Sequence, residues 1–181
     1  LGASLVSVLF VSFSGVGHAT TWVGDTSSDW NDNLNWSGDA GTGGSNAVIN
    51  TATPVAVISA NIPATPVDII VGNAGLTGRL DHTAGTAQTG NGNWMLVGVA
   101  NVNSNGTYNL ADVSTSGGTF TGFGTGSGSM TVGGSSTGGR LYVGGDDGGS
   151  DSGTGVVNVN TSGSLIVRND LVIGNQGGNG T

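Results

Sequence analysis

The stretch Ile69-Ile70-Val71-Gly72 is the first of four copies of one short pattern, in which apolar residues are followed by Val-Gly or Ile-Gly. The other copies are Met95-Leu96-Val97-Gly98, Leu141-Tyr142-Val143-Gly144 and Leu171-Val172-Ile173-Gly174. Successive copies begin 26, 46 and 30 residues apart. Repetition on this scale is typical of stacked architectures, in which no single unit buries its own apolar face.

A second pair of similar segments supports the repetition. Ser127-Gly128-Ser129-Met130-Thr131-Val132 and Ser162-Gly163-Ser164-Leu165-Ile166-Val167 each precede a copy of the first pattern. Further short strands are expected at 47–49, 55–58, 67–71, 79–82, 94–97, 107–110, 130–132, 141–143, 156–159 and 165–167. No window shows apolar residues at helical spacing, and frequent Gly disfavours helix. The sequence therefore predicts an all-β chain.

Similar segments at similar places in each repeat favour a parallel β-solenoid. In such a fold each strand pairs with its equivalents in the neighbouring repeats, about 4.8 Å away. We expect Val, Leu, Ile and Met to point inward, and Thr, Ser, Asn and Asp to point outward. An antiparallel β-sandwich or jelly roll is the alternative. It accounts for the number of strands but not for the similarity of the segments.

The composition limits the possible functions. The chain has 181 residues, of which 37 are Gly, with no Cys, Lys or Glu. Its 11 Asp outnumber Arg79, Arg140 and Arg168, so the formal net charge is -8. Such a surface repels phosphate, so we expect no binding to nucleic acid or to anionic membrane surfaces. The lack of Cys excludes thiol catalysis, disulfides and thiolate metal sites.

The chain begins with an apolar run, Leu1–Gly17, that is too short to span a bilayer comfortably. Small residues at Gly17 and Ala19 match the positions that a signal peptidase reads. We therefore expect residues 1–19 to be an export signal, truncated at its N-terminus and cleaved after Ala19. The alternative is a buried N-terminal strand or helix. His18 would leave with the signal.

Two regions follow the predicted signal. Residues 20–66 hold Trp22, Trp30 and Trp36, several Asp residues and all three prolines. We expect them to form a cap that shields the first repeat, because an exposed strand edge pairs with foreign strands. Residues 67–181 hold the repeats, which we expect to continue beyond this sequence.

Several motifs resemble bacterial exported proteins that carry autotransporter-associated or PEP-CTERM-associated Gly-rich β-strand repeats. The motifs are Thr21-Trp22-Val23-Gly24, Asp29-Trp30, Leu34-Asn35-Trp36, Ala47-Val48-Ile49-Asn50, Leu141-Tyr142-Val143-Gly144, Gly163-Ser164-Leu165-Ile166-Val167 and Leu171-Val172-Ile173-Gly174. The resemblance implies a right-handed β-helix, secreted or displayed at a Gram-negative-type cell surface. Contact with the outer membrane would then come only from an anchor or barrel that this sequence does not include.

Two groups of residues could carry chemistry. The Gly-rich loop with Asp146, Asp147 and Asp151 offers the oxygen ligands that Ca²⁺ requires, although a solvated acidic loop is the favoured interpretation and no other cofactor is expected. Arg79, Asp81 and His82 combine a cation, an acid and a base. In a strand Arg79 and Asp81 share one face and His82 takes the other, so they do not converge as acid–base catalysis requires.

We therefore expect a non-catalytic exported stalk or adhesin-like surface, with many weak contacts acting together. Its partners would be cell-surface, extracellular-matrix or glycan ligands. The alternative is a carbohydrate-binding or polysaccharide-degrading β-helix, in which Trp22, Trp30 and Trp36 would stack on sugar rings.

Overall fold

The computed structural model describes residues 20–38, 44–111, 115–116, 119–120, 126–145 and 153–181. Within them the structure is nearly all β, and the only helices are two short 3-10 turns, η1 (Asn33–Asn35) and η2 (Asn175–Gly177). None of the described helices has the length and apolar character needed to cross a membrane. The predicted all-β class is confirmed.

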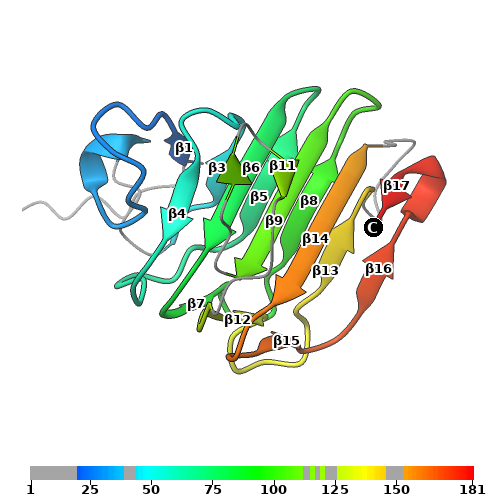
Figure 1. Ribbon diagram of the computed structural model, residues 1–181. Helices are drawn as coiled ribbons and strands as arrows, with labels where there is room; N and C mark the ends of the chain where they lie inside the picture. The colour runs from blue at the N-terminus through cyan, green and yellow to red at the C-terminus, as the bar shows by residue number, and fades with distance from the viewer. Residues whose placement is uncertain (1–19, 39–43, 112–114, 117–118, 121–125, 146–152) are drawn as a thin grey trace, which may run out of the picture.

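Most strands belong to three sheets whose neighbouring strands run parallel, apart from one pair at the end of the first sheet (Figure 1). The first sheet has the order β16 (Leu171–Ile173), β13 (Leu141–Val143), β8 (Met95–Val99), β5 (Ile69–Asn73), β3 (Ala47–Ile49), β1 (Thr20–Trp22) and β2 (Trp36–Ser37). The second has the order β17 (Asn179–Gly180), β14 (Thr154–Asn160), β9 (Asn105–Ala111), β6 (Thr77–His82) and β4 (Ala56–Ile58). The third has the order β15 (Leu165–Val167), β12 (Ser129–Val132) and β7 (Thr86–Gln88).

The chain visits these sheets in a fixed order. It passes from β5 to β6 to β7, then from β8 to β9 to β12, and then from β13 to β14 to β15. We call one such passage a rung. Among the described residues, antiparallel pairing is limited to β1 with β2 and to the small hairpin of β10 (Thr115–Ser116) and β11 (Thr119–Phe120). The antiparallel sandwich considered as an alternative is therefore wrong.

The repeated sequences pair with one another in register. In the first sheet Met95 pairs with Ile69 on one side and with Leu141 on the other, and Leu141 pairs with Leu171. In the third sheet Met130 pairs with Leu165. The four copies of the opening pattern therefore lie directly over one another. The strands β3 and β4 pair in the same way with β5 and β6, so parallel stacking already begins within residues 20–66.

Alternation along the strands places one set of apolar side chains inside the stack. Ile69, Met95 and Leu141 are fully buried in a core that draws on all three sheets. At the last rung the equivalent Leu171 and its neighbour Ile173 are each 54% exposed. No described residue lies on the far side of β16, which ends its sheet.

The outward positions of the first sheet differ from the prediction that outward residues are polar. Leu96 and Tyr142 point away from the core and form a second buried apolar cluster, with Ile70, Trp94 and Val172 packed against it. Ile70, Leu96, Tyr142 and Val172 hold successive places in one column because their strands pair in register. Each side chain is covered largely by its neighbours in the column, so apolar residues are stable there.

The Gly that ends each repeat is required by the corner between the first and second sheets. Gly72, Gly98 and Gly144 have φ angles of 71°, 69° and 69°, in the left-handed region that favours Gly. A Cβ atom at Gly98 would overlap the carbonyl oxygen of Thr154 in the next rung. The backbones of neighbouring rungs therefore approach so closely at this corner that no side chain fits.

Candidate functional site

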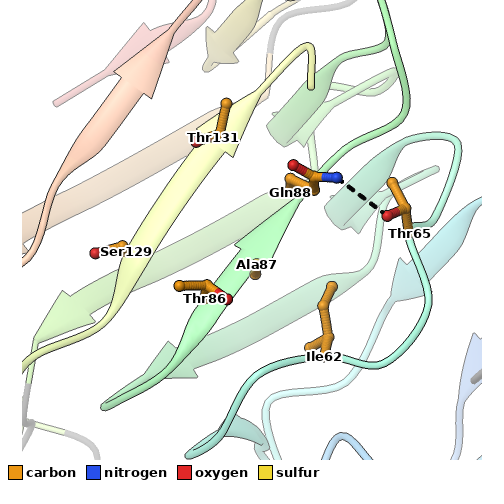
Figure 2. Close-up of a pocket in the computed structure, with 7 residues that line it drawn as sticks. All are labelled: Ile62, Thr65, Thr86, Ala87, Gln88, Ser129 and Thr131. Carbon is orange, nitrogen blue, oxygen red and sulfur yellow. Dashed lines mark hydrogen bonds between the residues drawn. The ribbon is translucent and has the colours of Figure 1, made fainter. Parts of the chain in front are cut away.

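A pocket of about 370 Å³ lies on the third sheet (Figure 2). Five of its lining side chains are polar and uncharged, and two are apolar. The lining residues are Ile62, Thr65, Thr86, Ala87, Gln88, Ser129 and Thr131.

Strand geometry places the four central polar side chains. Residues that alternate along a strand point to the same face, so Thr86 and Gln88 share the outer face of β7. Ser129 and Thr131 share the same face of β12, and they pair directly with Thr86 and Gln88. The result is a two-by-two array of three hydroxyls and one amide, with neighbouring strands about 4.8 Å apart. Figure 2 shows this array beside Ile62 and Thr65.

The remaining wall of the pocket is a segment that forms no strand. Pro63 removes a backbone N–H that a ladder of strands would need. The segment is held by hydrogen bonds instead: Ile62 N donates to the carbonyl oxygen of Thr86 (3.0 Å), and Gln88 Nε2 donates to Thr65 Oγ1 (3.3 Å). The third sheet therefore has no strand at this rung. The pocket occupies the space that such a strand would fill beside β7.

The three tryptophans proposed as an alternative glycan platform are packed in the interior. Trp22, Trp30 and Trp36 are 2%, 3% and 5% exposed. The ring of Trp36 lies 5.2 Å from that of Trp22 and 4.7 Å from that of Trp30, at interplanar angles of 84° and 77°. No ring face is open to a sugar, so this geometry does not support the glycan role. The rings fill the end of the core beside β1 and β2, as a cap requires.

A buried amide organises the segment that carries these rings. Asn35 is fully buried, and its Oδ1 accepts from the backbone N of Thr26 and of Ser27 at 2.9 Å each. Asp32 caps η1 by accepting from Leu34 N (3.0 Å). Hydrogen bonds from the Thr26 hydroxyl and from Leu34 N lower the pKa of Asp32. The hydrogen bonds of these polar groups stabilise the turn. This role of Asn35 was not predicted from the sequence.

Arg79 and Asp81 lie on the outer face of the second sheet. The guanidinium of Arg79 donates twice to the Asp81 carboxylate, at 2.9 Å and 2.7 Å. The same carboxylate accepts from Asn109 Nδ2, and Asn109 in turn accepts from Asn158 Nδ2, each at 2.7 Å. These groups form a structural polar ladder across three rungs, because β6, β9 and β14 pair in register.

His82 points the other way, into the core. It is fully buried, with Nδ1 at 3.1 Å from the Tyr108 hydroxyl and Nε2 at 3.1 Å from the Gly85 carbonyl oxygen. A carbonyl only accepts, so Nε2 carries the proton and Nδ1 accepts from Tyr108. Arg79 and Asp81 therefore share one face and His82 lies on the other, as predicted from strand alternation.

The buried imidazole predicts a loss of stability in mild acid. Burial lowers the pKa of His82 below 6.5, so the unfolded state binds the proton more readily. The free energy of unfolding should therefore fall as the pH drops below about 6.5. Burial raises the pKa of Asp68, which acts with the opposite sign at lower pH. Urea titrations followed by Trp fluorescence at pH 7.5 and pH 5 measure the effect.

His82→Gln is the control for this prediction. Glutamine does not titrate, so the variant should lose the decline between pH 6.5 and pH 5, although it is less stable at pH 7.5. An unchanged decline in His82→Gln would assign the pH dependence to other groups.

Two predicted features lie outside the described residues: the acidic loop with Asp146, Asp147 and Asp151, and the export signal at residues 1–19. Within the part of the chain that the structure describes, no three His, Cys, Asp or Glu side chains come together as a metal site would require.

Comparison of the chain with family models, curated proteins and solved structures found no match. The function of this chain is therefore inferred from its own residues and contacts.

Proposed function

We propose that this chain forms a right-handed β-helix that is exported and serves as a non-catalytic stalk or adhesive surface. The observation that carries the proposal is the pairing of like segments in three parallel sheets, which the chain visits in a fixed order. In such an arrangement each further rung adds about 4.8 Å of length. Length and a repeated outer face are the properties that a stalk needs.

The N-terminal end of the stack supports this proposal. The antiparallel strand β2 covers the edge of β1, and the three buried Trp rings close the core next to it. β2 then ends the sheet, and with only two residues it offers a short edge for pairing with strands from other molecules. The proposed likeness to autotransporter-associated or PEP-CTERM-associated repeats is consistent with such a capped stack.

The arrangement of the titratable residues supports the non-catalytic part of the proposal. Asp81 is held by Arg79 and Asn109, and His82 by Tyr108 and Gly85, on opposite sides of one strand. Acid–base catalysis needs such groups to reach one reacting atom. We therefore favour a surface that acts through many weak contacts over a polysaccharide-degrading enzyme.

Immunolabelling of intact cells tests the export and display. Antibodies raised against purified residues 20–181 should label the surface of intact producing cells, or should detect the chain in the medium. The matched control is a cytoplasmic protein of the same cells, which should be labelled only after lysis. Labelling of this chain only after lysis would contradict the proposal.

A further inference from the structure

We propose that the pocket on the third sheet is a binding site for a neutral saccharide of one or two sugar units. The inference goes beyond the stalk function, since a stalk needs no pocket, and it depends on the local geometry alone. Its central elements are the paired outward side chains of β7 and β12 and the wall formed by Ile62 and Thr65.

The size and lining of the pocket define the class of ligand. Its volume of about 370 Å³ lies in the lower part of the range for small-molecule sites. A free Ser or Thr hydroxyl offers one donor and two acceptor positions, and the Gln88 amide offers two donors and two acceptor positions. Part of this capacity is used within the protein, because the Thr86 hydroxyl donates to Asn61 Oδ1 (3.0 Å) and Ser129 Oγ accepts from Ser164 N (3.2 Å). Sugar hydroxyls also donate and accept, so the remaining donor and acceptor positions of the lining have matching partners.

Charged ligands fit the pocket less well. None of its lining residues is ionisable, so it offers no cation for a phosphate or carboxylate and no carboxylate for a metal ion. The chain carries a formal net charge of -8, which repels anions at long range. A ligand that is polar but uncharged is therefore favoured.

Two further features suit a sugar ring. Ile62 provides an apolar part of the wall, against which the C–H face of a ring can pack. The hydrogen bond from Gln88 Nε2 to Thr65 Oγ1 is long, at 3.3 Å, so the amide can exchange this partner for a ligand hydroxyl at little cost. Because no aromatic ring lines the pocket, we expect weak binding, with Kd of about 1 mM.

An NMR titration tests the proposal directly. ¹⁵N-labelled protein is titrated with maltose, cellobiose, lactose and N,N′-diacetylchitobiose, each to 50 mM, with digalacturonic acid as the charged comparison. At least one neutral disaccharide should shift the backbone amides of β7 and β12 and the side-chain NH₂ signals of Gln88. The absence of such shifts with all four neutral probes would overturn the proposal, as would tighter binding of digalacturonic acid.

Matched variants assign the binding to the array. Thr131→Val keeps the side-chain shape and removes one hydroxyl, and Ser129→Ala removes another. The double variant should bind the best probe about tenfold more weakly. The control is Thr107→Val on the outer face of β9, at a similar half-buried position, which should bind as the original chain does. Unchanged affinity in the double variant would also overturn the proposal. Dispersed amide signals establish that each variant is folded.

Discussion

Gly98→Ala is expected to lower the free energy of unfolding by about 4 kcal/mol, which is a large effect for a single methyl group. Two costs combine. Gly98 has φ of 69°, where an L-residue with a Cβ costs about 1–2 kcal/mol. The added methyl would also overlap the carbonyl oxygen of Thr154. Relieving this overlap means moving the first sheet away from the second at the corner of a rung, where both backbones take part in parallel ladders.

Gly44→Ala separates these two costs. Gly44 also has positive φ, at 99°, but a Cβ there would meet nothing within 4 Å. This variant should therefore lose only the conformational part, about 1–3 kcal/mol. Urea unfolding at pH 7.5 measures both variants. Equal losses would mean that backbone conformation alone requires Gly at the corner, and that the close approach of the rungs contributes nothing.

The predicted strands are confirmed where the sequence contains repeated apolar alternation. Segments such as 141–143 and 165–167 were expected from their resemblance to other segments, and these same likenesses fix their register in the sheets. A strand that pairs with near copies of itself gains the same contacts on both sides. In this chain, similarity along the sequence is therefore direct information about which residues are neighbours in space.

The strand β7 could not be predicted from similarity along the sequence. Its sequence, Thr86-Ala87-Gln88, has a single small apolar residue, so it lacks the alternation that predicts a strand. It is a strand because β12 supplies a paired neighbour, and because Ala87 suits the space at the inner face. The pocket beside β7 depends in turn on the path of the Pro-containing segment, which no local pattern describes.

The outer faces were also difficult to predict. Leu96 and Tyr142 are apolar at outward positions, and they are stable there because they pack in a column across neighbouring rungs. Asp81, Asn109 and Asn158 form the polar equivalent on the second sheet. Either column forms only when residues from several rungs align in register. A single residue therefore does not predict whether its outer column is apolar or polar. Burial of the inward residues, in contrast, can be predicted from the alternation within each strand.

Trp36→Ala is expected to lower the free energy of unfolding by about 4 kcal/mol, within the range for a buried Trp. Trp36 is the central ring of the cap, in edge contact with both Trp22 and Trp30, and its Nε1 donates to the Trp30 carbonyl oxygen at 2.9 Å. The truncation would leave a cavity between the other rings and would leave that carbonyl without its partner. It would also loosen β2, where Trp36 pairs with Trp22 across the antiparallel ladder.

Trp94→Ala is the matched control, because Trp94 is only half-buried and packs outside the core, against Tyr142. We expect it to cost about 1–2 kcal/mol, less than a fully buried ring. The two variants should also differ in association. A loosened β2 exposes the edge of β1, and an exposed edge recruits other strands. Light scattering should therefore detect concentration-dependent oligomers in Trp36→Ala beyond any formed by Trp94→Ala. Equal stability losses and equal association would show that the three rings fill space without protecting the end of the stack.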